Sequence, residues 1–332
     1  MCLRIGHSCG SSGFPLPLSL FRLSVLIAIA ISLLSCSKKD DYKYDDGVDS
    51  ETPYREWSST KKIVVTTYGS LDFSHQSAAL YGDYAIYVSD GRYLFCLYSM
   101  KERKKLFTLS MPGMDPKIYH CNQSTFGIHK YKSTDSFPLL YISQRAASDG
   151  RCFVEVFRII TSSDDFNSSD FSFSVEKVQT IHFPAMTNEN SMGNVNAVID
   201  QENGVLYTYS RNNNSIEETY GRCKVSSFDI PDITIKDVYL EDSDIRSSYM
   251  INYNAFNMQG ACIEDGILYI GHGFLSAGFI VLNVVDLYQQ KQIRQMNLMK
   301  SGVLWEPEGC FFYNGCVMLS ETEAIHEMHK KN

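Results

Sequence analysis

Positive charge is scarce in this sequence. Its 332 residues include 30 Lys and Arg against 38 Asp and Glu, which gives a formal net charge of −8. Proteins that bind the phosphate backbone need a dense cover of Lys and Arg, so we expect no nucleic-acid partner. A globular chain of this length buries about 75% of the surface of its unfolded state, so a full hydrophobic core is within reach.

Common catalytic motifs are missing as well. The only Gly-x-Ser-x-Gly string is Gly6-His7-Ser8-Cys9-Gly10, which lies in the leader segment described below, and residues 36–332 contain no such elbow, no phosphate-binding loop and no His-Glu-x-x-His motif. A glycosidase needs two carboxylates at a fixed separation. Among the polar residues that we predict below to line a central channel, the only carboxylates are Glu306 and Glu308, with Pro307 between them. The sequence therefore favours a binding protein over an enzyme.

No hydrophobic run is long enough to span a bilayer, but a shorter one lies near the N-terminus. Residues 23–34 form a mostly apolar run of 12 residues, whereas a spanning helix needs about 20. The run ends in Leu33-Leu34-Ser35-Cys36, which resembles the lipobox of bacterial lipoproteins. The resemblance implies a signal peptide over residues 1–35, diacylglycerol on the Cys36 thiol and a fatty acyl chain such as palmitate on the new amino group. An uncleaved N-terminal anchor is the alternative.

A polar segment follows the proposed lipidation site. Residues 37–51 are nearly free of aliphatic side chains, so we interpret residues 36–60 as a lipidated cysteine and flexible tether. The stretch Lys38-Lys39-Asp40-Asp41 resembles the signals that send lipoproteins of Bacteroidota to the outer face of the outer membrane. The resemblance implies a lipid anchor in the outer membrane, facing the periplasm or the cell surface. Removal of residues 1–35 changes the net charge to −10.

Cysteine and histidine patterns give little support for cross-links or metal sites. Apart from the leader and Cys36, seven cysteines remain, an odd number without a Cys-x-x-Cys spacing, which is typical of apolar core residues. At most one pair, such as Cys310 and Cys316, is expected to bridge. His326 and His329 are expected at an exposed strand end rather than at a metal.

Residues 61–332 read as one all-β domain. Short runs rich in Val, Ile, Tyr and Phe alternate with Gly, Asp and Asn, as in many antiparallel strands. One motif recurs, because residues 259–269 align without gaps on residues 308–318 and more loosely on residues 76–86. Two weaker copies bring the number of motifs to five, and they start at Gln76, Gln123, Asn196, Gln259 and Glu308. Successive starts are 47, 73, 63 and 49 residues apart, and a unit of four strands that repeats at about this spacing is typical of a β-propeller blade.

The end of the sequence predicts how the ring closes. Only 25 residues run from Glu308 to the C-terminus, enough for three strands, and the N-terminal strand 62–68 is free to supply the fourth. We therefore predict a β-propeller of five four-stranded blades, in which strand 62–68 pairs with strand 324–329 and leaves no open edge. Six blades, or two β-sandwiches, are the alternatives.

The first residue of each motif copy is polar, and together these residues predict a polar girdle at one mouth of the propeller's central channel. The reason is that the first strand of each propeller blade lines this channel. Amides donate and accept hydrogen bonds, which suits sugar hydroxyls or peptide groups. The alternative is that these amides bond one another and channel water. The predicted ligand-binding residues are Gln76, Gln123, Asn196, Gln259 and Glu308, with Trp305 as a stacking platform and His75, His120, Asn122, Asn194 and Glu306 as neighbours.

One segment suggests a second reading. Trp305-Glu306-Pro307-Glu308-Gly309 resembles the Glu-Gly segment of gluconolactonase-like and phytase-like propellers. The resemblance implies that Glu308 approaches a divalent cation, and we add Asn194 and Asn196 as oxygen ligands. Those families place further carboxylates on neighbouring blades, where this sequence has amides. The first hypothesis is therefore a lipid-anchored propeller that binds a glycan, peptide or protein without a cofactor, and the second is a divalent-cation-dependent hydrolase or lactonase around Glu308.

Overall fold

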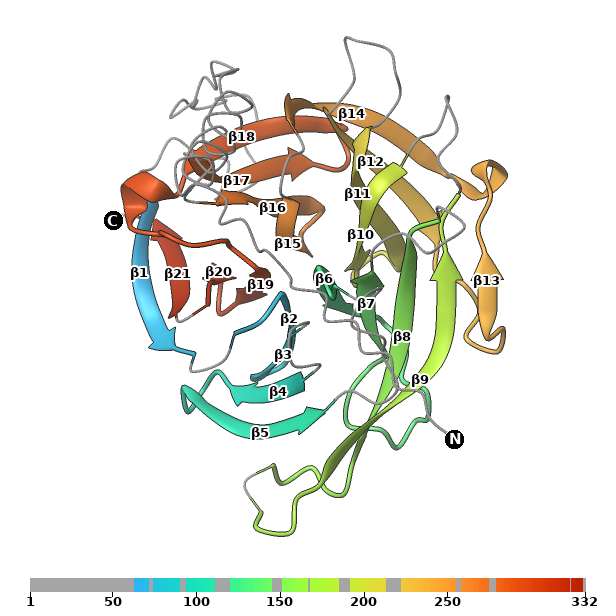
Figure 1. Cartoon of the computed structure of the whole chain (residues 1–332), viewed down its shortest axis with the longest axis vertical. Coiled ribbons are helices and arrows are strands. Elements are labelled where there is room, and N and C mark those ends of the chain that lie inside the picture. Colours follow the sequence, from blue (N-terminus) through green and yellow to red (C-terminus); the bar gives the residue numbers. More distant parts are fainter. Residues whose placement is uncertain are drawn as a thin grey trace, which may run out of the picture. The chain divides into compact units, whose positions relative to one another are not determined.

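A ring of β-sheets makes up the folded part of the chain. The structure, a computed structural model, describes residues 63–71, 74–89, 94–110, 120–144, 151–166, 168–184, 192–212, 222–254, 258–274, 279–322 and 324–330. Within these ranges five sheets surround one axis, as Figure 1 shows in the view along it. The predicted all-β, five-bladed propeller is confirmed. The predicted leader, Cys36 and the tether lie outside the described residues.

The blades follow one another along the chain, and each begins with its innermost strand. Blade 1 contains β2 (Ser77–Tyr81), β3 (Tyr84–Ser89), β4 (Leu94–Ser99) and β5 (Lys104–Ser110). Blade 2 contains β6 (Gln123–Phe126), β7 (Leu140–Gln144), β8 (Phe153–Thr161) and β9 (Phe173–His182). Blade 3 contains β10 (Met192–Asp200), β11 (Val205–Asn212), β12 (Arg222–Asp229) and β14 (Ser247–Asn254). Blade 4 contains β15 (Met258–Glu264), β16 (Ile267–Phe274), β17 (Phe279–Asp286) and β18 (Lys291–Asn297).

Blade 5 joins the two ends of the propeller domain. It contains β19 (Gly309–Tyr313), β20 (Cys316–Ser320), β21 (Ala324–Lys330) and, outermost, β1 (Ile63–Ser70). β1 pairs with β21 in antiparallel register from Ile63 opposite Lys330 to Ser70 opposite Ala324. The predicted closure is therefore confirmed, and Figure 1 shows the blue β1 beside the red β21. This pairing covers the edge that β21 would otherwise expose.

Tight turns set the register of the repeated hairpins. Asp265-Gly266 joins β15 to β16, and Asn314-Gly315 joins β19 to β20. All four residues have positive φ, between 50° and 78°. Two consecutive positive φ values define the hairpin turn whose twist matches that of the flanking strands, and Asp-Gly and Asn-Gly are the pairs that adopt it most easily. The aligned turns of the sequence motif therefore have a direct structural cause.

Side-chain alternation along the strands builds the core between blades. In β3, Ala85 and Tyr87 join an apolar cluster shared with blade 5, whereas Ile86 and Val88 join one shared with blade 2. Each of the five interfaces between neighbouring blades holds such a cluster. Successive side chains of a strand point to opposite faces, so each blade contributes to two clusters and the ring is held together by them.

Two features account for the uneven blade spacing. Blade 2 carries a fifth strand, β13 (Asp237–Tyr239), which belongs to the connection between β12 and β14 but pairs in parallel with β9. The same blade has long β8 and β9 strands, whose hairpin extends from the ring at the bottom of Figure 1. The sequence predicted four strands per blade and did not predict β13.

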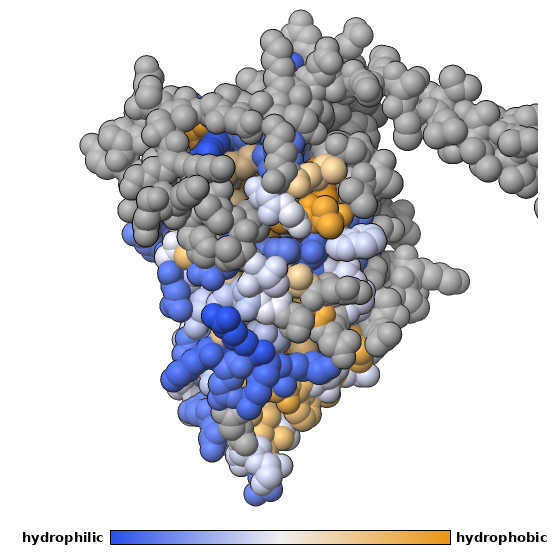
Figure 2. Space-filling model, turned by 90° about the vertical axis from the view of Figure 1, so that its left-hand side faces the viewer, coloured by the Kyte–Doolittle hydropathy of each residue, from blue (hydrophilic) through white to orange (hydrophobic). Residues whose placement is uncertain are grey.

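The outside of the ring is polar where it can be seen. Figure 2 shows the side that carries β1, where hydrophilic atoms dominate the described surface and hydrophobic atoms form scattered patches. No helix in the part of the chain that the structure describes is long and apolar enough to cross a bilayer.

Candidate functional site

The inner strands of the five blades surround the axis, and they define two ends of a central channel. β2, β6, β10, β15 and β19 are the innermost strands. We call the end at which they begin the strand-start mouth and the end at which they finish the strand-end mouth. The predicted girdle lies at the strand-start mouth.

The inner strands of blades 4 and 5 approach each other backbone to backbone. A Cβ atom on Gly260 would lie 2.5 Å from the carbonyl oxygen of Glu308 and 2.7 Å from the amide nitrogen of Cys310. A Cβ atom on Gly309 would lie 2.6 Å from the Cβ of Ala78 in blade 1. Real Cβ atoms do not tolerate such distances, so glycine is required for the ring to be this narrow.

Gln123 spans the channel instead of facing its mouth. Its side chain is fully buried, and its Nε2 donates a 2.8 Å hydrogen bond to the carbonyl oxygen of Ala261. Its Oε1 accepts a 2.9 Å hydrogen bond from the Ala261 amide. Gln123 belongs to blade 2 and Ala261 to blade 4, which are not neighbours in the ring. This Gln123–Ala261 bridge satisfies the inner edge of β15 and separates the two mouths.

The remaining girdle side chains form pairs. Gln76 Nε2 donates to Glu308 Oε1 at 3.2 Å, joining blades 1 and 5. Asn122 Nδ2 donates to Asn196 Oδ1 at 2.8 Å, joining blades 2 and 3. Gln259 is buried, and its backbone carbonyl accepts the Tyr209 hydroxyl at 2.5 Å. The structure therefore brings Gln76 to Glu308 and Asn122 to Asn196, while the side chain of Asn194 lies outside the described residues.

Trp305 lies on a fixed backbone beside this mouth. Its side chain is 54% exposed and that of Leu304 is 50% exposed, although both precede the buried start of β19. The Glu321 carboxylate accepts hydrogen bonds from the amides of Leu304 at 3.2 Å and Trp305 at 2.8 Å. Glu321 Oε1 also lies 2.9 Å from His326 Nε2, and both side chains are buried.

The electrostatics of Glu321 favour its charged form. Burial acts to raise the pKa of this carboxyl, but the hydrogen bonds from His326 and from the Trp305 and Leu304 amides outweigh burial and lower the pKa below its ordinary value. The expectation of an exposed strand end is therefore wrong for His326, because it is the buried partner of Glu321. The side chain of His329 lies outside the described residues.

Metal ligands do not gather at the strand-start mouth. Glu308 is only 4% exposed, and Asn196, one of its proposed co-ligands, accepts the Asn122 hydrogen bond. Within the described ranges, no three His, Cys, Asp or Glu side chains are grouped closely enough to hold a metal ion. The residues present thus provide one buried carboxylate and amide oxygens.

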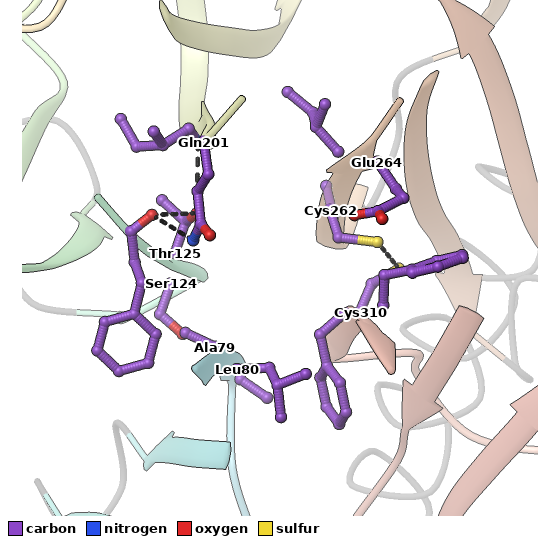
Figure 3. A pocket seen from close by; sticks show the side chains of 15 residues that line it. Ala79, Leu80, Ser124, Thr125, Gln201, Cys262, Glu264 and Cys310 are labelled. Carbon is purple, nitrogen blue, oxygen red and sulfur yellow. Dashed lines mark hydrogen bonds between the residues drawn. The ribbon is translucent and has the colours of Figure 1, made fainter. Parts of the chain in front are cut away.

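A small cavity opens at the strand-end mouth, on the other side of the Gln123–Ala261 bridge. It has a volume of about 90 Å³ and is lined by residues of all five inner strands (Figure 3). Ligand pockets usually measure 300–1,000 Å³, so this one suits a few water-sized molecules. The sequence predicted none of its labelled lining residues as a ligand-binding residue and suggested only Cys310, for a bridge to Cys316. These residues are Ala79, Leu80, Ser124, Thr125, Gln201, Cys262, Glu264 and Cys310.

One acidic side chain, Glu264, lines this cavity, and the carboxylates of Asp265, Glu202 and Asp200 lie near it. Glu264 is exposed, but partial withdrawal of its carboxyl from water raises its pKa, and these negative charges raise it further. Gln201 Nε2 donates a 3.0 Å hydrogen bond to the carbonyl oxygen of Phe126. The rim therefore opposes the ionised form of Glu264, in contrast to the donors that favour ionised Glu321.

The described cysteines are all free thiols, and six of the seven are buried, as expected for core residues. The Cys310 thiol contacts the Cys262 thiol, and their sulfur atoms are 3.3 Å apart. Cys316, named in the sequence analysis as a partner for Cys310, is half-buried on β20. The structure thus brings together a different pair from the one that the strand order suggested.

Comparisons with known proteins identify no family. No protein-family model and no curated protein sequence matches the chain. Among solved structures, glutaminyl cyclase of Myxococcus xanthus is 8% identical with a TM-score of 0.44, and the match covers 81% of this chain and 97% of that one. The PQQ-bound aldose sugar dehydrogenase of Streptomyces coelicolor is 11% identical with a TM-score of 0.47, covering 81% and 99%. A luciferin-regenerating enzyme is 9% identical with a TM-score of 0.42, covering 80% and 95%. Similarities this low say nothing about the activity of this chain.

Proposed function

We propose that this chain is a lipid-anchored β-propeller of a bacterial outer membrane that binds a polar ligand without catalysis. The ligand is a glycan, a peptide or a protein segment, and it binds at the strand-start mouth. The anchor rests on the lipobox-like sequence that ends at Cys36. The binding site rests on one observation, the exposed Trp305 whose backbone the buried Glu321–His326 pair holds in place.

A fixed, exposed indole is well suited to stacking. Aromatic side chains supply large contact areas at low entropic cost, because only two side-chain torsions must be ordered. Here the backbone of Trp305 is already held by Glu321, so binding orders little of the protein. Leu304, equally exposed beside it, extends the apolar surface that a sugar ring or an aliphatic peptide side chain would contact.

The half-buried amides of the mouth supply the polar part of recognition. Gln76 Nε2 uses one of its two donors on Glu308, whereas Asn122 Nδ2 donates both to Asn196 Oδ1 and, at 3.3 Å, to the carbonyl oxygen of Met258. Gln76 therefore offers a ligand a donor and an acceptor, and Asn122 offers its acceptor oxygen. Glu308 contributes the only carboxylate among the five aligned positions. A ligand with neighbouring hydroxyl or amide groups would extend these pairs rather than break them.

Glycan and peptide arrays probed with the purified full-length chain test this proposal. We expect saturable binding to a subset of probes, at least tenfold weaker for Trp305→Ala because the stacking surface is lost. Tyr288→Ala is the matched control, since Tyr288 is 65% exposed and lies beside Gly266 at the strand-end mouth. Silence on both arrays, or equal losses for the two variants, would contradict the proposal.

A divalent-cation-dependent hydrolase or lactonase is the second candidate, and the buried Glu308 carboxylate favours it. Glu308 is only 4% exposed and accepts a hydrogen bond from Gln76, and a cation would add a positive charge beside this buried carboxylate. Glu308 and Asn196 would then supply oxygen ligands. Thermal unfolding and esterase or lactonase assays, with Ca²⁺, with Mg²⁺ and with a chelator, test this role. It requires a melting temperature or a rate that depends on the cation and no longer does so in Glu308→Gln.

A further inference from the structure

Two thiols from neighbouring blades touch at the wall of the strand-end cavity. Cys262 lies in β15 of blade 4 and Cys310 in β19 of blade 5, and Figure 3 shows the contact between their sulfur atoms. The distance is 3.3 Å. A disulfide bond is about 2.05 Å long, so the sulfurs must approach by roughly 1.3 Å to bond.

The backbone around this pair keeps the thiols close. β15 and β19 meet at Gly260 and Gly309. A Cβ atom placed on Gly260 would lie only 2.7 Å from the amide nitrogen of Cys310. Both thiols also belong to the apolar cluster between blades 4 and 5. The two strands therefore cannot separate locally without opening this interface.

We propose that Cys262 and Cys310 form a disulfide bond that ties blade 4 to blade 5 when the chain folds in an oxidising compartment. The oxidant is a disulfide of a small thiol or of a protein. The Cys262 thiolate attacks it and releases one thiol, and the Cys310 thiolate then attacks the Cys262 sulfur and releases the second. The two cysteines lose two electrons and two protons, which the two released thiols carry away.

The timing of this reaction follows from burial. Burial and the neighbouring Cys310 raise the pKa of Cys262, so the closed interface holds little thiolate. The cavity of about 90 Å³ is also too small for a glutathione molecule. The exchange therefore takes place during folding, or when the interface between blades 4 and 5 opens transiently. An envelope location, as the leader implies, would provide the oxidising conditions.

The bond would stabilise the ring at one blade interface. It closes a loop from residue 262 to residue 310, which contains the outer three strands of blade 4. A cross-link over a loop of this length restricts the unfolded chain, so we expect the melting temperature to rise by several degrees.

Peptide mapping without reduction tests the proposal. The full-length chain is incubated with reduced and oxidised glutathione, at a urea concentration just below its unfolding transition, where interfaces open transiently. Free thiols are then alkylated in denaturant. Digestion with trypsin and chymotrypsin separates Cys310 from Cys316, because Phe311, Phe312 and Tyr313 lie between them.

We expect most molecules to yield a Cys262–Cys310 linked peptide pair, 2 Da lighter than the sum of its reduced parts and lost on reduction. Alkylation of both cysteines in most molecules, or a link from Cys310 to Cys316, would overturn the proposal. A second measurement uses the melting temperature. Reduction should lower it in the oxidised wild type and in Cys96→Ala, which removes a buried thiol of blade 1, but not in Cys262→Ser. An equal drop in Cys262→Ser would also overturn it.

Discussion

At the strand-start mouth, buried and half-buried polar side chains bond one another, and the exposed Trp305 precedes Glu308 by three residues on a backbone held by Glu321. At the strand-end mouth, the same five strands line a cavity of about 90 Å³ with apolar, hydroxyl and amide side chains, two thiols and the carboxylate of Glu264. Two carboxylates show the contrast, because hydrogen-bond donors lower the pKa of Glu321 while burial and like charges raise that of Glu264. The Gln123–Ala261 bridge separates the two environments.

The difference shows how a ring of repeated blades acquires two unlike ends. Each blade supplies an amide or a carboxylate where its inner strand begins and a small or apolar residue further along it. A polar end whose groups are already ordered is suited to binding a polar ligand, because little entropy is lost when the ligand arrives. The strand-end mouth contributes close packing and the contact between two blades.

The bridge is the feature whose loss should cost most. Gln123→Leu leaves the amide and carbonyl of Ala261 buried without their partner, and each unsatisfied group costs about 1–3 kcal/mol, so we expect a loss of about 4 kcal/mol. Urea unfolding measures it. Gln201→Leu is the control, since this exposed glutamine makes one hydrogen bond at the strand-end mouth and should lose under about 1 kcal/mol. Similar losses for both variants would show that the bridge contributes no more to the free energy of unfolding than the single hydrogen bond of Gln201.

The narrowness of the ring is tested next. In Gly260→Ala the new methyl group meets the backbone of Glu308 and Cys310, which cannot move aside, so we expect a loss of about 3 kcal/mol in urea unfolding. Gly302→Ala is the comparison, because no atom lies within 4 Å of its Cβ position and only its positive φ opposes the change, for about 1 kcal/mol. Equal stabilities of these variants would refute the close approach of β15 and β19.

Glu321 should stabilise the protein in a pH-dependent way. We expect Glu321→Gln to lose about 2 kcal/mol at pH 7, because the buried contact of the carboxylate with His326 is weakened while the backbone hydrogen bonds can persist. The folded-state pKa of Glu321 is lowered, so its contribution is present above the unfolded pKa of about 4.5 and is lost as the pH falls through the folded pKa. Unfolding curves from pH 7 to pH 3 should therefore converge. A constant difference across this range would contradict the assignment.

Glu264 should give the smallest effect, with the opposite sign. Its folded-state pKa is raised, so the ionised carboxylate opposes folding at neutral pH. We expect Glu264→Gln to raise the melting temperature slightly at pH 7, and the gain to vanish once the wild-type carboxyl is protonated in both states. Thermal unfolding at pH 7 and pH 4 compares them, and a lower melting temperature at pH 7 would show that the rim does not repel this charge.

Local patterns in the sequence were sufficient to predict most of the fold. The aligned Asp265-Gly266 and Asn314-Gly315 turns and the β1–β21 closure follow from hairpin chemistry and from the number of strands at the chain ends. β13 was missed because three residues carry no readable alternation and their partner strand belongs to an earlier blade.

The site was predictable only in part, because its details depend on distances across the ring. Alignment gives Gln123 and Gln76 the same position, yet only Gln123 reaches the far side of the channel. Cys262 and Cys310 occupy different positions of the aligned motif, and they meet because the glycines beside them let two backbones touch. The Glu321–His326 pair joins the ends of two strands and has no signature in the sequence.

Tryptophan fluorescence tests the central claim, that the ligand binds at the strand-start mouth, most directly. The chain contains only Trp57, in the predicted tether, and Trp305, so Trp57→Phe leaves Trp305 as the sole reporter. Titration of this variant with a glycan or peptide selected on the arrays should give a saturable change in emission, with the dissociation constant that calorimetry finds. Binding by calorimetry without any change in Trp305 emission would contradict the claim and place the ligand elsewhere on the propeller.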